Sequence, residues 1–395
     1  MYLLPKPKTI KEQDGQMLLC HSTHIVMTKE VAETEMHAAK RLQEAIRQET
    51  GLILPFSVGE VREGDLSLGI AKTLPEQTYE ITIDEKGGQI SGGDGAGVLY
   101  GVETFCQIVQ QCGGILPCVQ IQDAPDMPNR GYYFDQTRGR VLKLEELKKI
   151  ADRMCRYKLN QLQLYVEHTY LFRDFSEMWR DQTPLTAEEI LELDSYCRER
   201  HIELVPSLAS FGHLCTLLST KTYGDLCEME DSWKEPFSFW NRMRYHTINV
   251  SDERSLPLIK KMIAEYMQLF SSNKFNICAD ETFCLGKYKS KKLAEERGVH
   301  RLYIDYVKEL AQFLVENGKI PMFWGDIIWN SPELMKELPE SMICLNWGYA
   351  PEQREDETRA IAQTGAVQYL CPGVCGWNQC CLLYTSPSPR DRQKS

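Results

Sequence analysis

The sequence of 395 residues contains no uninterrupted apolar stretch approaching the length of about 18 residues that a transmembrane helix needs. It also has no basic block, because 45 Lys and Arg stand against 56 Asp and Glu and give a net charge of −11. An acidic chain of this kind is a poor candidate for binding nucleic-acid phosphates or an anionic membrane surface. Residues 1–6 include no apolar run typical of a secretory signal, so we expect a cytoplasmic protein.

Several motifs of other protein classes are missing as well. No Gly-x-Gly-x-x-Gly follows a predicted strand, which weakens a dinucleotide-binding interpretation, and no Gly-x-Ser-x-Gly nucleophile elbow occurs. Neither a Cys-x-x-Cys pair nor a His-Glu-x-x-His motif is present, so the usual zinc-binding patterns are missing. The 15 cysteines are odd in number and scattered along the chain, as is typical of free buried thiols in a reducing compartment. We therefore predict neither a metal nor a cofactor.

Residues 1–125 have the pattern of a small α+β domain, which ends at the proline-rich segment 124–128. Alternating apolar and polar residues indicate strands, and apolar residues at helical spacing indicate helices. The elements that we expect are a helix at 31–50, strands at 66–70 and 79–83, a hairpin that turns on Gly87 and Gly88, and a helix at 96–110.

From residue 126 to residue 379, short apolar strands alternate with amphipathic helices, one of which opens with the capping box Thr186-Ala-Glu-Glu189. Repeated β-α alternation over about 250 residues favours a (β/α)₈ TIM-type barrel over a doubly wound sheet. Seven strands are readable, and an eighth is missing. The expected strands are 132–135, 161–166, 202–208, 275–279, 321–324, 342–346 and 367–371.

The last segment, residues 380–395, differs from everything before it. It is polar, contains Pro387 and Pro389, and resembles translated read-through of a sequencing adapter. We interpret it as a non-native tail on an incomplete barrel. It is expected to make few buried contacts and to leave the barrel open between its first and seventh strands.

Two adjacent carboxylates, Asp280 and Glu281, end the fourth predicted strand. In a barrel of this type, chemistry takes place at the carboxyl ends of the strands. An exposed acidic loop start is the ordinary interpretation of an Asp-Glu pair. The position after a buried strand favours a catalytic pair instead, provided that the backbone turns there so that both side chains face the barrel mouth.

Other polar side chains follow neighbouring strands. Arg138 at the end of the first strand offers a forked donor to vicinal hydroxyls or an anion, or else pairs with Asp135. His213 follows the third strand, where a buried core histidine is the alternative. The second strand delivers Glu167 and His168.

Tryptophans lie at or just beyond three successive strand ends, the fifth, sixth and seventh. They are Trp324, Trp347 and Trp377, and Asp326 stands beside the first of them. One tryptophan usually belongs to the core, but three at successive strand ends predict an aromatic-walled pocket of the kind that binds the apolar face of a sugar ring.

Taken in order, these motifs resemble family 20 glycoside hydrolases, the β-N-acetylhexosaminidases, over residues 1–379. This sequence departs from the family pattern at Glu167 and His168, where most members have an aspartate, and at Tyr369-Leu-Cys371, where the family has Tyr-x-Asp. The motifs that carry the resemblance are the segment 96–101, Arg130-Gly, Asp135-Gln-Thr-Arg138, Phe211-Gly-His213, Ala279-Asp-Glu281 and Trp324.

The resemblance implies an exo-acting, retaining hydrolase without an enzyme nucleophile, in which the substrate's own acetamido oxygen forms an oxazolinium ion. Asp280 would orient the acetamido group, and Glu281 would act as general acid and then as base. Arg138 would bind the ring hydroxyls at the non-reducing end. The remaining roles implied are a tryptophan enclosure from Trp324, Trp347 and Trp377, a hydrogen bond from Tyr369 to the acetamido carbonyl, and support of the acids by His213.

Two other classes stay open on the sequence alone. One is a non-catalytic sugar-binding protein on the same scaffold, and the other is a barrel glycosidase with a carboxylate nucleophile. Turnover of an aryl N-acetylhexosaminide tests the first, and dependence on the N-acetyl group tests the second. The sequence does not separate N-acetylglucosamine from N-acetylgalactosamine as the terminal sugar of the glycan or glycoconjugate substrate.

Overall fold

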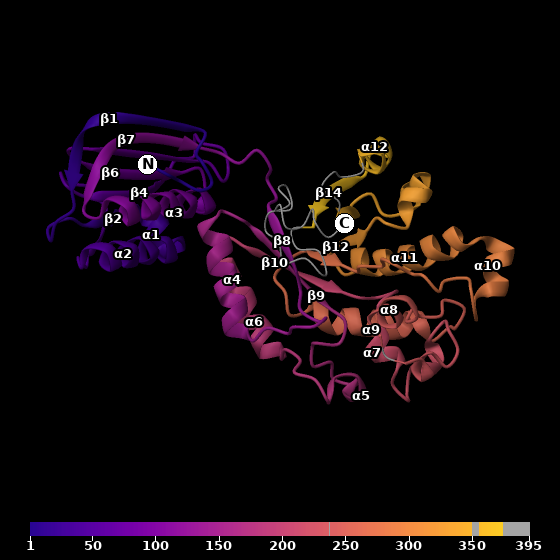
Figure 1. The fold of residues 1–395 in the computed structure, drawn as a ribbon. Helices are drawn as coiled ribbons and strands as arrows, with labels where there is room; N and C mark the ends of the chain where they lie inside the picture. The colour runs from indigo at the N-terminus through magenta and orange to yellow at the C-terminus, as the bar shows by residue number, and fades with distance from the viewer. Residues whose placement is uncertain (237, 350–354, 374–395) are drawn as a thin grey trace, which may run out of the picture. The chain divides into compact units, whose positions relative to one another are not determined.

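The computed structural model describes residues 1–236, 238–349 and 355–373, which fold into two compact units (Figure 1). The first unit holds Met1–Tyr133, Leu142–Leu162 and Leu191–Leu204, and the second holds the other residues described. None of the helices described is long and apolar enough to cross a membrane. The domain boundary expected near residue 125 stays a prediction.

The N-terminal sheet has seven strands in the order β1-β7-β5-β6-β4-β2-β3. Helices α2 and α3 pack against each other, and α3 contacts the central strands β5, β6 and β7 (Figure 1). The strands are β1 (Thr9–Leu18), β2 (Ile25–Met27), β3 (Phe56–Val58), β4 (Leu66–Ile70), β5 (Tyr79–Asp84), β6 (Gly87–Gly92) and β7 (Ile115–Asp123), and the helices are α1 (Lys29–Thr34), α2 (Met36–Thr50) and α3 (Gly95–Cys112).

Two local expectations for this sheet were wrong in detail. The single helix predicted at 31–50 is broken at Glu35, which has φ −121° and ψ 28° and turns its buried carboxylate to His201 Nε2 at 2.8 Å. The hairpin exists, but it turns on residues 85–86. Gly87 instead starts β6, where φ is +155° and a Cβ would lie 2.7 Å from the Asp65 carbonyl oxygen. That glycine permits a close approach between backbones.

All seven barrel strands expected from the sequence are present, in one sheet of order β14-β13-β12-β11-β10-β9-β8. From β10 to β14 the neighbours pair in parallel, as the β-α alternation predicts. The strands are β8 (Gly131–Asp135), β9 (Gln161–Val166), β10 (Glu203–Leu208), β11 (Lys274–Asn276), β12 (Ile320–Trp324), β13 (Ile343–Gly348) and β14 (Val367–Pro372).

This sheet is a half-barrel. Within the parts of the chain that the structure describes it has no eighth strand, and β8 and β14 form its two edges. The tail at 380–395 lies outside the described residues, so the expectation about its contacts stays a prediction. The strand predicted at 275–279 is shorter than expected, because β11 ends at Asn276 and the backbone leaves the extended conformation at Cys278, where φ is +58°.

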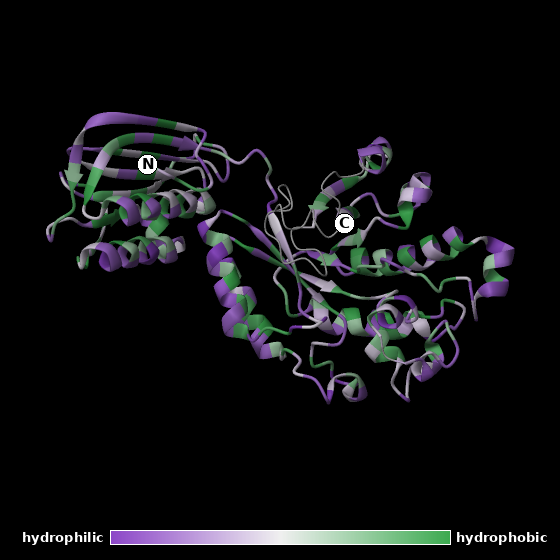
Figure 2. Cartoon of the chain, in the orientation of Figure 1, coloured by the Kyte–Doolittle hydropathy of each residue, from purple (hydrophilic) through white to green (hydrophobic). Residues whose placement is uncertain are grey.

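Helices connect the strands as the periodicity predicts. In α4, Leu147, Ala151 and Met154 are buried on one side while charged residues cover the other (Figure 2). The longer helices are α4 (Leu144–Arg156), α6 (Ala187–Arg198), α9 (Ser255–Met267), α11 (Val299–Glu316) and α12 (Glu355–Gln363), and the shorter ones are α5 (Ser176–Trp179), α7 (Cys215–Leu218), α8 (Phe239–Arg244) and α10 (Lys291–Arg297).

The capping box predicted at the start of α6 is confirmed. The backbone N–H of Glu189 donates to Thr186 Oγ1 at 3.2 Å, and the backbone N–H of Thr186 donates to Glu189 Oε2 at 2.9 Å. Both bonds satisfy amides that a helix start would otherwise leave without a partner.

We predict that Thr186→Ala lowers the free energy of unfolding by about 1 kcal/mol, because it removes the acceptor for the Glu189 amide. Urea denaturation followed by circular dichroism measures the change. Thr183→Ala, at an exposed position three residues earlier, is the matched control and should change stability by less than about 0.5 kcal/mol. Equal effects of the two variants would show that the capping bond contributes nothing.

Candidate active site

The segment after β11 departs sharply from strand geometry, and this departure places both acids. Cys278, Ala279 and Glu281 all have left-handed backbones, with φ of 58°, 62° and 49°. Such angles are rare outside glycine and persist only where surrounding structure holds them. Two buried hydroxyl groups help to stabilise this backbone conformation. Ser210 Oγ donates to the Ile277 carbonyl at 2.6 Å, and Tyr303 Oη donates to the Ala279 carbonyl at 3.0 Å.

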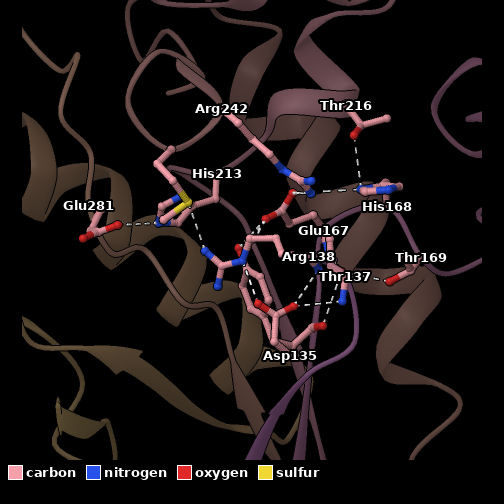
Figure 3. A network of polar contacts seen from close by, with 12 residues as sticks. Asp135, Thr137, Arg138, Glu167, His168, Thr169, His213, Thr216, Arg242 and Glu281 are labelled. Carbon is pink, nitrogen blue, oxygen red and sulfur yellow. Dashed lines mark hydrogen bonds and ion pairs between the residues drawn. The ribbon is translucent and has the colours of Figure 1, made fainter. Parts of the chain in front are cut away.

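His213 contacts both acids, and Figure 3 shows its contact with Glu281. The imidazole is buried, and its Nε2 lies 3.3 Å from Asp280 Oδ2 and 3.2 Å from Glu281 Oε2. The residue before it, Gly212, passes so close to the acidic segment that a Cβ there would lie 2.5 Å from the Asp280 carbonyl oxygen. The Phe-Gly-His motif is therefore needed for packing as well as for the histidine itself.

The charges in this cluster depend on one another. Burial alone would lower the pKa of His213, but the charge of Asp280 and the contacts with Asp280 and Glu281 raise that pKa to about 10. The pKa of the Asp280 carboxyl is lowered, because the effect of the His213 charge outweighs the effect of burial. At neutral pH the centre consequently holds an imidazolium beside the ionised Asp280.

The same three side chains are the group most suited to a metal ion in the part of the chain that the structure describes. Their donor atoms lie within 4.8 Å of one another. A metal ligand must be a neutral imidazole, however, and the raised pKa of His213 keeps the ring protonated. Binding of a metal ion by this group would therefore require the proton on His213 to leave.

Arg138 lies in the same polar network, at the same end of the sheet as the acids (Figure 3). Its Nε donates to Asp135 Oδ2 at 2.7 Å, so the salt bridge considered from the sequence is present. The guanidinium also lies 4.5 Å from the centre of the Tyr165 ring, and Nη1 lies 3.3 Å from Met243 Sδ. These contacts fix the plane of the guanidinium and hence the direction of its donors.

Glu167 and His168 have different surroundings. The buried Glu167 carboxylate accepts from Tyr165 Oη at 3.0 Å and from Arg242 Nη2 at 3.1 Å, and it lies 3.7 Å from Arg138 Nε. The two arginines outweigh burial and lower its pKa. His168 instead faces the Thr216 hydroxyl at 3.2 Å, and burial lowers its pKa. Of the two, Glu167 supports the arginine.

Two of the tryptophans and Tyr369 lie on the last three strands of the sheet. Trp324 ends β12 and is buried, and its backbone N–H donates to the Cys278 carbonyl at 2.9 Å, directly beside the acidic segment. Trp347 lies in β13, 5.2 Å from the Tyr349 ring. Tyr369 lies one strand further, in β14. Trp377 is outside the described residues, and a single cleft shared by these side chains with the acids stays a prediction.

Three residues that the sequence did not mark as site residues contact this network. Arg242 and Met243 come from α8, inside the long connection between β10 and α9, where no periodicity singles them out. Asp326 follows β12, and its Oδ2 accepts from the Glu281 backbone N–H at 3.0 Å. Its position two residues beyond a barrel strand was a usable signal for a site residue.

Family models match both parts of the chain. The one described as glycosyl hydrolase family 20, domain 2, matches residues 1–124, and the one described as glycosyl hydrolase family 20, catalytic domain, matches residues 128–375. Curated relatives include a β-hexosaminidase of Porphyromonas gingivalis, 24% identical over 95% of this chain and 50% of the relative, and a β-hexosaminidase of Vibrio furnissii, 26% identical over 71% and 48%. The chain spans about half the length of these relatives.

Solved structures show the same fold at low sequence identity. The β-N-acetylhexosaminidase of Bacteroides fragilis aligns with a TM-score of 0.76 and 18% identity, over 95% of this chain and 77% of that one. The Flavobacterium johnsoniae chitobiase aligns with a TM-score of 0.79 and 19% identity, over 94% and 59%. The half-barrel and the N-terminal α+β sheet are therefore an arrangement found in known structures.

The raised pKa of His213 predicts a pH-dependent contribution to stability. Folding raises this pKa above its unfolded value of about 6.5, so the stabilisation is complete below that pH and is lost as the pH rises through about 10. We expect wild type to exceed His213→Asn in free energy of unfolding by about 3 kcal/mol at pH 6, with the difference shrinking towards pH 10.

Urea denaturation of both proteins from pH 6 to pH 10 measures this difference. His21→Asn, at an exposed position, is the control and should show no such trend. A difference that stays constant with pH would mean that His213 is not held as an imidazolium.

Proposed function

The chain belongs to glycosyl hydrolase family 20, and from this premise we propose that it is an exo-acting, retaining β-N-acetylhexosaminidase. The observation that carries the proposal is the cluster at the end of β11, where Asp280 and Glu281 both lie against the protonated His213. Its substrate is a glycan or glycoconjugate with a terminal β-linked N-acetylhexosamine. The comparisons give no support to a non-catalytic sugar-binding protein or to a carboxylate nucleophile.

In the first step the acetamido oxygen of the substrate attacks the anomeric carbon, and the bond to the leaving group breaks. Glu281 gives its proton to the departing glycosidic oxygen. Asp280, which the lowered pKa keeps ionised, accepts a hydrogen bond from the acetamido N–H and offsets the positive charge of the oxazolinium ion. In the second step Glu281 takes a proton from water, which adds to the anomeric carbon with net retention of configuration.

His213 contacts both acids. Its positive charge favours the ionised form of Asp280. It also keeps the side chain of Glu281 in contact with the centre, with Oε2 at 3.2 Å from Nε2. Substrate-assisted hydrolysis requires one carboxylate that offsets positive charge and one carboxyl group that transfers protons.

Arg138 binds the ring hydroxyls at the non-reducing end, which makes the enzyme exo-acting. Asp135 and Tyr165 fix the guanidinium, and Glu167 adds negative charge behind it. Trp324 and Trp347 enclose the sugar, and Tyr369 donates to the acetamido carbonyl. Aromatic faces suit the apolar face of a pyranose ring, and a forked donor suits its vicinal hydroxyls.

The proposal is tested by the dependence of turnover on the N-acetyl group. Purified protein is assayed on aryl β-glycosides of N-acetylglucosamine and N-acetylgalactosamine, and on the aryl β-glucoside that lacks the acetamido group. We expect turnover of at least one N-acetyl substrate and none of the glucoside above background. Equal turnover of the glucoside would indicate an enzyme nucleophile instead.

The two acids should respond differently to substitution. We predict that Glu281→Gln lowers kcat by about a hundred-fold to ten-thousand-fold on an aryl glycoside with a poor leaving group, because proton transfer is lost. A very acidic leaving group needs no proton, so most of the loss should disappear there. Asp280→Asn should lower kcat for both substrates alike, since it acts on the acetamido group.

Initial rates on a matched pair of leaving groups measure this contrast. Glu333→Gln, an exposed position on the connection after β12, serves as the control and should leave both rates within about two-fold of wild type. If Glu281→Gln reduced both rates equally, the general-acid assignment would be wrong.

A further inference from the structure

A third carboxyl group lies beside the two acids. Asp326 stands two residues beyond Trp324, the last residue of β12, and its Oδ2 accepts a hydrogen bond from the Glu281 backbone N–H at 3.0 Å. The bond joins the loops that follow two neighbouring parallel strands. It reaches the main chain of Glu281 and not its side chain.

The backbone that receives this bond is strained. Glu281 has φ +49°, a left-handed conformation that is unfavourable for a residue with a Cβ. Immediately after it the chain turns again, because the Phe283 N–H donates to the Glu281 carbonyl at 2.7 Å. The direction of the Glu281 side chain is set by this conformation, so whatever holds the main chain also aims the carboxyl group.

The charges around Asp326 indicate how it can occupy this position. In the part of the chain that the structure describes, the titratable groups that interact with it include Asp280 and Glu281 from the loop after β11, Tyr303 from α11 and Cys344 from β13. Burial and the charge of Asp280 raise the pKa of Asp326 to about 8. At neutral pH the group accepts the amide hydrogen bond without adding another negative charge beside Asp280.

The second carboxyl oxygen of Asp326 indicates that this side chain is not present for packing alone. Asp326 Oδ1 is buried and has no hydrogen-bond partner within the described parts of the chain. A buried polar atom without a partner is unfavourable, so packing alone does not explain a carboxyl group at this position. The hydrogen bond that Oδ2 of this side chain makes to another residue is the one to the Glu281 main chain.

We propose that Asp326 is a positioning residue for the general acid, because its carboxyl oxygen holds the left-handed main chain of Glu281 that turns the Glu281 carboxyl towards His213 and the leaving-group oxygen. This inference rests on the proposed function. It gives Asp326 an effect on the proton-transfer step alone, while a residue needed only for folding would affect every step.

The test compares Asp326→Ala with Asp326→Asn on N-acetylhexosaminides that carry a poor or a very acidic aryl leaving group. Ala removes the acceptor, and we expect kcat to fall about 10-fold to 100-fold with the poor leaving group but about three-fold or less with the acidic one. Asn keeps a neutral oxygen that accepts the Glu281 amide. We expect it to be at least about five-fold more active than Ala with the poor leaving group.

Two further variants separate positioning from general damage. Asp326→Leu keeps the branched shape without the acceptor and should reproduce the leaving-group dependence of Ala, so the test survives if Ala does not fold. Glu337→Ala removes another carboxylate from the connection after β12, one that pairs with Arg301 at 2.7 Å, and should change both rates by less than about two-fold. Thermal unfolding of each variant checks that the fold is intact.

The result that overturns the inference is an equal loss on both leaving groups, or an Asn variant no more active than Ala, in proteins that unfold cooperatively. Failure of the proposed function looks different. It is a wild-type chain that does not turn over either N-acetyl substrate, and the role of Asp326 would then fall with it.

Discussion

The site depends on one interaction, the buried contact of the His213 imidazolium with two neighbouring carboxylates. Adjacent residues of a regular strand face opposite sides, so both acids reach one imidazole only because the backbone leaves β11 early and becomes left-handed at Ala279 and Glu281. A partly buried negative charge at Asp280 is unfavourable without a cation beside it. The histidine supplies that cation, and Gly212 allows its loop to come close enough.

The surrounding network follows from the same electrostatic constraint. Arg138 and Arg242 bring two more positive charges to the end of the sheet, and the buried Glu167 lies against both. Each charged group has a partner of opposite sign, which is the condition under which buried ions are tolerated. Asp326 meets the condition in another way, since its raised pKa leaves it neutral. The centre thus holds a cation, His213, beside Asp280, and a carboxyl group, that of Glu281, for proton transfer.

Some features of the N-terminal sheet follow from the local sequence, and others depend on tertiary contacts. The pairing of β5 with β6 followed from alternation alone, because the period of two is a local property of the chain. The break of the first helix at Glu35 did not, and there the Glu35 side chain contacts His201, a residue 166 positions away. Likewise Gly87 was assigned to a turn, and its real role, passing the Asp65 carbonyl, required knowledge of the neighbouring strand.

The sequence by itself determined the seven barrel strands, the capping box at Thr186 and the presence of Asp280 and Glu281 at a strand end, because periodicity, helix caps and chain order are local signals. Only the tertiary structure decided that both acids meet His213, that Arg242 reaches Glu167 across 75 positions, and that Asp326 bonds the Glu281 backbone. Those contacts join loops after different strands. Their geometry depends on strand register and on left-handed backbone angles, neither of which a residue pattern encodes.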